Sequence, residues 1–290
     1  MMRRYWPHRA MRWALLACAA GGVLMWGCGG PPKGETPTGA GPASVPNNAD
    51  TVGLYGPAKG TFMLTSSRHP NTVEKTFAFG PTKASMVAIA GDWNADRADE
   101  VGVYDPQAST FYLAERGSGK AAAKLPWGEQ NAGWLPIAGD WDGDGRDGVG
   151  LYDPAQGMFR LRNSTSGQAS ELKVRFGPRR SKWLPIAGDW DGDGKDTVGL
   201  YDPPTRIFRL INSFEKPGGK SYLKFSVYGG QAGALSVVGE WDGDGKDTVG
   251  WYDGASSTFY IKNANRGGAP DVKIRLGVKG EKLQPIAGRW

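Results

Sequence analysis

The residues best suited to chemistry are closely spaced acids in a glycine-rich stretch at 188–202, which reads GDWDGDGKDTVGLYD. Carboxylates this close repel one another unless a hard cation lies among them. Ca²⁺ takes about six to eight oxygen ligands at about 2.3–2.6 Å, so a tight loop of alternate acidic side chains suits it. The intervening glycines permit the positive φ that a short loop around an ion needs. The acids are Asp189, Asp191, Asp193 and Asp196.

This stretch has two alternative interpretations, an EF-hand loop and a turn without metal. An EF-hand loop begins in the same way, but the bidentate Glu at its twelfth position is replaced here by Leu200. The segments on either side, PIAGDW and TVGLYD, have the character of strands rather than helices. An Asp/Gly-rich hairpin turn without metal would need the same residue types. We favour Ca²⁺, because the acids recur in register elsewhere in the chain.

The acidic stretch is one part of a long repeat. Tryptophans in it fall at 93, 141, 190, 241 and 290, which gives a nearly constant period. Half a copy, DTVGLY, stands at 50–55, and the complementary half, PIAGRW, stands at 285–290. A fixed period of this size indicates one supersecondary unit repeated around a ring or along a stack. The other full copies occupy 91–105, 139–153 and 239–253.

Each period contains four apolar segments with the alternation of strands. In the third unit they are PIAGDW, TVGLYD, IFRLIN and YLKFSVYG, and the acidic loop joins the first two. Four strands per period is typical of a propeller blade. The two half-copies at the chain ends complete one blade between them, which favours a closed ring over an open stack. The sequence therefore predicts an all-β, five-bladed β-propeller over 50–290, closed by pairing of its N- and C-terminal strands.

GDWDGDGKDTVGLYD resembles the FG-GAP or VCBS repeats of integrin α-chain propellers and many bacterial surface proteins. The resemblance covers nearly all of 50–290 and implies Ca²⁺ in the loop between the first two strands of a blade. The implied ligand sets are Asp140, Asp142 and Asp144; Asp189, Asp191 and Asp193; Glu240, Asp242 and Asp244; and the weaker Asp92, Asn94 and Asp96, where Arg97 replaces a glycine.

Two positions depart from that family pattern. Many members place the last acid at loop position nine, whereas here it stands at position eight. We keep these residues as candidate ligands: Asp99, Asp147, Asp196 and Asp247. The loop split between the chain ends has Arg289 in place of its first acid, so we expect no metal there. That arginine is expected to offset Asn47 and Asp50 instead.

The first 49 residues predict export from the cytoplasm. Four arginines and no acid in residues 1–12 precede the short apolar stretch 13–26, which together indicate a signal peptide over 1–27. Cys28 resembles the acylated cysteine of a bacterial lipoprotein, and an ordinary cleaved signal or an uncleaved anchor are the alternatives. Residues 28–49 are rich in Gly and Pro and predict a disordered tether. We expect a monomer, lipid-anchored at the bacterial cell envelope, or alternatively secreted.

Composition narrows the function. The body contains a single histidine, His69, and no cysteine, which excludes His-based triads, thiol chemistry and His-ligated catalytic zinc. Without the N-terminal arginines the chain is near charge balance, which gives no reason to expect nucleic acid. We therefore expect a non-enzymatic calcium-binding module that binds a protein or a glycan. The alternatives are a carbohydrate-active enzyme (a polysaccharide lyase or glycosidase) and a structural envelope module.

Aromatic and basic residues were considered as binding surfaces. The tryptophan and tyrosine that recur once per unit are expected to pack between blades rather than stack on sugars. The tryptophans outside the repeat are better candidates for a binding face: Trp127, Trp134, Trp183 and Trp251. Basic residues concentrate in the third unit and are expected to be a solvated strand face more than an anion site. They are Arg160, Arg162, Lys173, Arg175, Arg179, Arg180 and Lys182.

Overall fold

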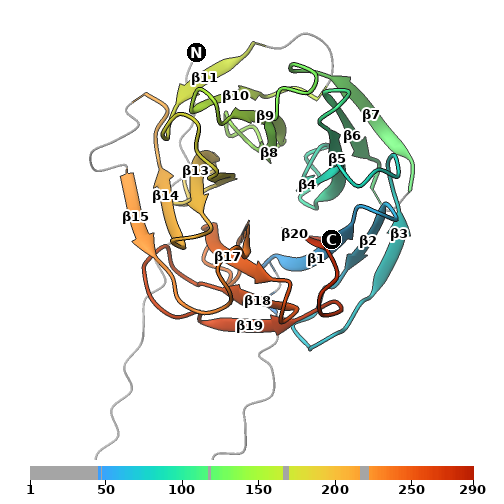
Figure 1. The fold of residues 1–290 in the computed structure, drawn as a ribbon, viewed down its shortest axis with the longest axis vertical. Coiled ribbons are helices and arrows are strands. Elements are labelled where there is room, and N and C mark those ends of the chain that lie inside the picture. The colour runs from blue at the N-terminus through green and yellow to red at the C-terminus, as the bar shows by residue number, and fades with distance from the viewer. Residues whose placement is uncertain (1–44, 47, 117–118, 166–169, 216–221) are drawn as a thin grey trace, which may run out of the picture. The chain divides into compact units, whose positions relative to one another are not determined.

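The structure is a computed structural model that describes residues 45–46, 48–116, 119–165, 170–215 and 222–290. Within these ranges, 20 strands hydrogen-bond into five antiparallel sheets of four strands each. The sheets surround a common centre, and β3, β7, β11, β15 and β19 lie at the rim (Figure 1). The predicted five-bladed propeller is therefore confirmed.

We number the blades I to V and give their strands from centre to rim. Blade I contains β20 (Gln284–Gly288), β1 (Thr51–Gly56), β2 (Thr61–Leu64) and β3 (Lys75–Ala78). Blade II contains β4 (Val87–Gly91), β5 (Glu100–Asp105), β6 (Thr110–Ala114) and β7 (Ala121–Pro126). Blade III contains β8 (Leu135–Gly139), β9 (Gly148–Asp153), β10 (Met158–Arg162) and β11 (Leu172–Arg175). Blade IV contains β12 (Leu184–Gly188), β13 (Thr197–Asp202), β14 (Ile207–Ile211) and β15 (Tyr222–Ser226). Blade V contains β16 (Leu235–Gly239), β17 (Thr248–Asp253), β18 (Thr258–Ile261) and β19 (Val272–Arg275).

Blade I is built from both ends of the described chain, as the cut repeat predicts. Strand β20 pairs with β1 in antiparallel register, with Gly53 opposite Ile286. Beyond this pairing, Val52 and Leu54 of β1 share a buried core cluster with Trp241 and other residues of blade V. The ring therefore closes through a sheet and through a core.

Each blade packs on its neighbours through the two faces of its second strand. In β13, Val198 and Leu200 lie in the core shared with blade III, whereas Tyr201 lies in the core shared with blade V. Successive residues of a strand point to opposite faces, which explains this division. A Cβ at Gly199 would lie 2.7 Å from Leu210, so only glycine fits the tight face beside Tyr201.

The aromatic residues of the repeat pack as expected. The tyrosine of each second strand contacts the phenylalanine of the third, with ring centroids 4.4–4.6 Å apart. The tyrosines are at most 1% exposed, and the tryptophans at 93, 141, 190 and 241 at most 6%. The repeated aromatics therefore supply blade cores rather than open sugar platforms.

Of the four tryptophans outside the repeat, Trp134 and Trp251 are buried, and Trp127 and Trp183 are partly exposed. Trp251 is fully buried and stacks on Tyr260 with centroids 5.6 Å apart. Each of the other three has an arginine guanidinium over its ring, in the geometry of a cation–π contact. Their separations are 5.3 Å for Trp127 and Arg162, 4.8 Å for Trp134 and Arg160, and 3.7 Å for Trp183 and Arg209.

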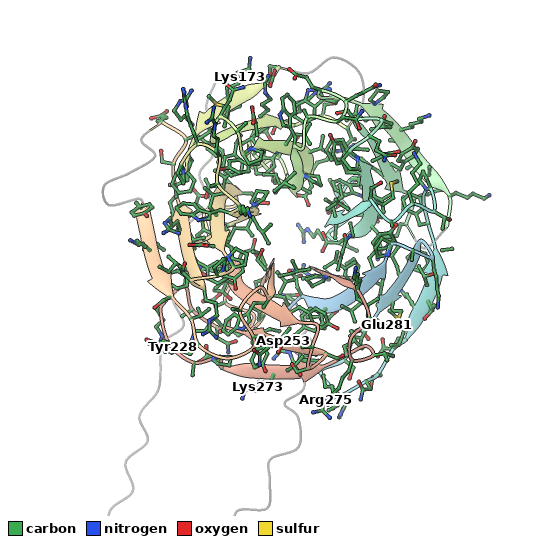
Figure 2. The ribbon with its side chains drawn as sticks, in the orientation of Figure 1. Lys173, Tyr228, Asp253, Lys273, Arg275 and Glu281 are labelled. Carbon is green, nitrogen blue, oxygen red and sulfur yellow. The ribbon has the colours of Figure 1, made fainter. Side chains whose placement is uncertain are left out.

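These contacts divide the basic group of the third unit into two parts. Arg160 and Arg162 cover tryptophans, so they are part of the packing. Lys173 lies at the outer rim, as do Lys273 and Arg275 of blade V (Figure 2). Basic side chains on an outer strand discourage edge-to-edge pairing between molecules. The remaining members are exposed to solvent: Arg175, Arg179, Arg180 and Lys182.

The predicted signal peptide (1–27), Cys28 and the first part of the tether lie outside the described residues. The end of the tether contacts the body, since Ala49 is 6% exposed and the Asn48 carbonyl accepts from Arg289 Nη2 at 2.7 Å. The packed chain thus begins a few residues before the expected boundary at Asp50. No helix among the described residues has the length and apolar character needed to cross a bilayer.

Candidate metal centres and the carboxylate ring

Three loops, each between the first two strands of a blade, gather three carboxylates apiece. In each loop, one oxygen from every acid lies within 4.8 Å of the others. The first acid is partly or fully buried, and the other two are exposed. The groups are Asp140, Asp142 and Asp144 in blade III, Asp189, Asp191 and Asp193 in blade IV, and Glu240, Asp242 and Asp244 in blade V.

The first acid organises its own loop. In blade IV, Asp189 Oδ1 accepts the N–H groups of Gly192 at 2.7 Å and Asp193 at 3.1 Å, and Oδ2 accepts that of Gly194 at 2.8 Å. The two glycines have φ of 80° and 84°, the left-handed conformation that this winding requires. The second and third acids then project from a fixed turn. Because every side-chain donor is an oxygen and the outer side is open to water, the residues fit Ca²⁺.

The basic residue at loop position seven lies beside the preceding acidic loop. A Cβ at Gly143 would be 2.9 Å from Cγ of Lys195, and one at Gly192 would be 3.3 Å from Cγ of Lys246. The lysine stems therefore pack on the glycines of the neighbouring loop. This placement brings an ammonium group from the next blade close to each of these two acidic clusters.

The blade II loop is held together by protein contacts. Asn94 donates from Nδ2 to Glu100 Oε1 at 2.9 Å. Asp96 accepts from Arg116 Nη1 at 2.7 Å, so a guanidinium lies where an ion would compete for the carboxylate. Burial is the main cause that raises the pKa of Glu100 to about 7. We therefore do not include Asp92, Asn94 and Asp96 among the proposed metal sites.

The loop split between the chain ends contains an arginine and no acidic cluster. Arg289 donates from Nη2 to the Asn48 carbonyl at 2.7 Å, and its Nε lies 3.9 Å from Asp50 Oδ1. The expected offset of Asp50 by Arg289 agrees with this geometry, while Asn47 lies outside the described residues. This arginine ties the first residues of the body to the last strand.

The aspartate at loop position eight reaches the preceding blade instead of its own loop. Asp196 Oδ2 accepts the N–H of Asp140 at 2.9 Å, and the Asp196 N–H donates to the Asp140 carbonyl at 2.8 Å. We call this two-bond contact the clasp, and it recurs at all five joints between blades. The pairs are Asp50 with Glu240, Asp99 with Arg289, Asp147 with Asp92, Asp196 with Asp140, and Asp247 with Asp189.

The clasps change the proposed metal ligands. Of the sequence-predicted sixteen, nine are in the three carboxylate clusters. The four at position eight each use a carboxylate oxygen to accept a backbone N–H from another blade, so we leave them out of the metal sites. These are Asp99, Asp147, Asp196 and Asp247.

Burial raises the pKa of every clasp carboxyl above its ordinary value of 3.8. The pKa rises to about 6 for Asp50, about 7 for Asp147 and about 8 for Asp247. It rises well above the ordinary value for Asp99 and Asp196. After burial, repulsion from other clasp carboxylates adds to the shift at four of the five, while hydrogen bonds from the backbone oppose it. The five acids thus form one interacting ring.

A glycine directly before each loop makes room for the clasp. A Cβ at that glycine would lie only 2.6–3.0 Å from the clasp aspartate. This close approach, rather than a positive φ, explains why the repeat has glycine there. The five positions are Gly91, Gly139, Gly188, Gly239 and Gly288.

The sequence contains a signal for the clasps, although the repeat pattern predicts metal binding by the same aspartates. An aspartate follows the acidic loop in all four full copies, and Asp50 stands at the same point of the split copy. Its presence in the split copy, which lacks an acidic loop, separates its role from that of the cluster acids. Spacing along the chain does not show which blade the side chain contacts, however, because the partner is 55 residues away for Asp147 and 56 for Asp196.

No protein-family profile matches the chain, and no curated protein matches it. Among solved structures, it is similar to an Agrocybe aegerita lectin that recognises non-reducing terminal N-acetylglucosamine, with 15% identity, a TM-score of 0.40, and coverage of 80% of this chain and 63% of the lectin. It is also similar to a Bacteroides caccae protein of unknown function, with 11% identity, a TM-score of 0.40, and coverage of 80% and 81%.

A third similar structure is that of BBS1N in complex with ARL6DN, soaked with lead. There the identity is 9%, the TM-score 0.34, and the coverage 69% of this chain and 60% of the other. The chain spans less than two thirds of the length of this structure and of the lectin. At these identities and TM-scores, the ligands of the similar proteins do not bear on what this chain binds.

Proposed function

We propose that the chain is a calcium-stabilised propeller that serves as an extracytoplasmic binding module for a protein or glycan. The observation that carries the calcium assignment is the recurrence of three carboxylates within 4.8 Å in three loops. When bound, Ca²⁺ would supply positive charge that cancels the repulsion inside each cluster. The first acid would keep its hydrogen bonds to the loop backbone, and the two exposed acids would coordinate the ion with it.

The metal sites are coupled to the ring through the clasps. The backbone of the first cluster acid in blades III, IV and V is bonded to a clasp aspartate of the next blade. An ion that fixes this acid would therefore also hold the joint between two blades. A ligand bound only by the folded state at 100 times its Kd adds about 2.7 kcal/mol per site.

Differential scanning calorimetry of metal-free protein with and without millimolar Ca²⁺ tests the calcium assignment. We expect a higher Tm with Ca²⁺, and a smaller rise in the triple variant D142N/D191N/D242N. The control is Glu129→Gln, which removes an exposed charge far from the loops. An equal rise in Tm in the triple variant and in the wild type would show that the clusters do not bind the stabilising Ca²⁺.

The role as a binding module is tested separately. The body contains no cysteine for thiol chemistry, and its single histidine, His69, is exposed to solvent outside the acidic loops. We therefore expect binding on a glycan array or in a protein pull-down at millimolar Ca²⁺, without turnover in lyase and glycosidase assays. Turnover abolished by one substitution outside the acidic loops would replace the binding module with an enzyme.

We propose attachment to the bacterial envelope through acylated Cys28, on the basis of the N-terminal sequence. Cys28→Ser should move the protein from the membrane fraction to the soluble extracytoplasmic fraction. A protein that stays in the membrane fraction after this change would favour an uncleaved anchor.

A further inference from the structure

Two arginines interrupt the repeat on the acidic-loop side. At loop position six, the loops of blades III, IV and V have glycines with φ of 79–84°, whereas blade II has Arg97 with φ of 69°. The left-handed conformation is unfavourable for a residue with a Cβ, so this arginine is held in a conformation that favours glycine. Backbone strain of this kind is concentrated at active sites and ligand-binding sites.

The second interruption is Arg289, which stands where the other loops have Asp or Glu. Its backbone N–H fulfils the structural role of that position by donating to the Asp99 clasp at 2.6 Å. The guanidinium donates to Asn48 through Nη2, and its buried Nε lies 3.9 Å from Asp50 Oδ1. An acidic side chain at this position is therefore not needed for the clasp, and Nη1 of the guanidinium can donate to another group.

Both arginines line one cavity of 380 Å³, together with Asn48. Acids from the other side of the ring, Asp189 and Glu240 among them, complete the lining. Because the lining comes from blades I, II, IV and V, the cavity lies across the centre of the propeller. Its volume is within the range of about 300–1,000 Å³ usual for small-molecule sites.

The acids that line the cavity already accept hydrogen bonds from the protein, whereas the Arg97 guanidinium makes none to any described residue. Asp189 accepts three backbone N–H groups of its own loop, and Glu240 Oε1 accepts two. Asp247 Oδ2 accepts the Asp189 N–H. The Arg97 guanidinium has no hydrogen bond or ion pair within the described residues. The Arg97 guanidinium therefore has all its donors free of bonds to the described part of the chain, and such donors match planar oxyanions.

We propose that this central cavity binds a small ligand through a carboxylate or phosphate group held by Arg97 and Arg289. The site shares Asp189 and Glu240 with the blade IV and blade V clusters, but its ligand would be held by the arginines and does not need Ca²⁺. Cavity size limits the ligand to roughly the dimensions of a monosaccharide acid or a sugar phosphate. Asn48 and the carboxylates across the cavity would accept hydrogen bonds from its hydroxyl groups.

Isothermal titration calorimetry with inorganic phosphate and with D-glucuronate tests the site. The protein is first made metal-free and then dialysed free of chelator, since chelators are themselves polycarboxylates. We expect binding of at least one probe, weakened roughly tenfold or more in Arg97→Gly, because a charge-assisted hydrogen bond contributes about that factor. Phosphate alone, glucuronate alone or both would identify which oxyanion the site prefers.

The Arg97→Gly variant keeps the test independent of folding. Glycine is the residue of the three regular loops, so the variant should unfold at the same or a higher temperature. The matched control is Arg146→Ala, which removes an arginine of the neighbouring loop that donates to the Asn94 carbonyl at 3.3 Å and does not line the cavity. This control should bind the probes as the wild type does.

Three results would overturn the oxyanion site. The first is that neither probe binds to the wild type at about 10 mM, a concentration that is ample for a two-arginine site. Equal weakening by both variants would show non-specific attraction to surface charge. Unchanged affinity for both probes in Arg97→Gly would show that this arginine does not hold the ligand. Loss of Ca²⁺ binding at the clusters would leave this inference unaffected.

Discussion

The ring of clasp carboxylates predicts that the metal-free protein becomes more stable on acidification from pH 8 to pH 5. Burial raises the pKa of Asp147 to about 7, while an unfolded chain keeps the ordinary 3.8. Between these two values the folded state binds more protons than the unfolded state. Stability from this group is therefore complete below about pH 4 and declines as pH rises through about 7. This is the reverse of ordinary acid denaturation.

The size of the effect at Asp147 has an upper bound. A shift of about three pKa units corresponds to about 4 kcal/mol at 1.36 kcal/mol per unit. The acids of the ring titrate together, so a single substitution should recover only part of this. Asp147→Asn removes the charge and keeps an oxygen for the Asp92 N–H, which donates at 2.9 Å. We expect this variant to gain stability at pH 8 and to gain less at pH 5, where the folded-state carboxyl is already protonated.

Asp147→Ala separates charge from hydrogen bonding. It also removes the charge, but it leaves the Asp92 N–H without its acceptor, at a cost of about 1–3 kcal/mol at both pH values. For a domain of this size, 1 kcal/mol moves the Tm by about 2–4 °C. Urea unfolding at pH 5 and pH 8, with Glu129→Gln as the surface control, measures all these differences. Equal losses in the Asn and Ala variants at pH 8 would refute the account of the ring as repelling buried acids.

Three further changes test the packing. Gly139→Ala should destabilise by about 1–3 kcal/mol in chemical denaturation, because its Cβ would lie 2.6 Å from Asp196 Oδ2; an unchanged midpoint would show that the joint can relax. Arg209→Ala should cost about 0.5–2 kcal/mol in thermal unfolding through loss of the contact 3.7 Å above Trp183, and Arg209→Lys should recover only part of it. Deletion of 284–290 removes β20 and should abolish cooperative unfolding seen by circular dichroism, whereas an open stack of blades would keep it.

The architecture was predictable because the repeat is nearly complete in every unit. Four apolar segments in each period indicated four strands per blade, and the half-copies at 50–55 and 285–290 indicated where the ring closes. The acids that gather in three loops were also predictable, since alternate positions in a tight turn must converge. These are local properties, which a short stretch of chain determines by itself.

Contacts between units could not be predicted in this way. The clasp of Asp196 joins residues 56 apart, and its direction depends on how two blades meet. Trp183 was open to interpretation as a binding platform until its position under Arg209 was known. The left-handed conformation of Arg97 and its place in the central cavity depend on the folded loop. In each of these cases, the contact partner lies in a separate segment of the chain, or the backbone conformation of the folded loop sets the position of the side chain.

The central functional claim is that the three acidic loops hold calcium. Equilibrium dialysis of metal-free protein against Ca²⁺, with the bound metal counted by atomic emission, tests it most directly. We predict three ions per chain at saturation, and two in Asp191→Asn, which impairs only the blade IV cluster. No bound Ca²⁺ at millimolar concentration, or the same count in a variant with all three clusters altered, would contradict the claim.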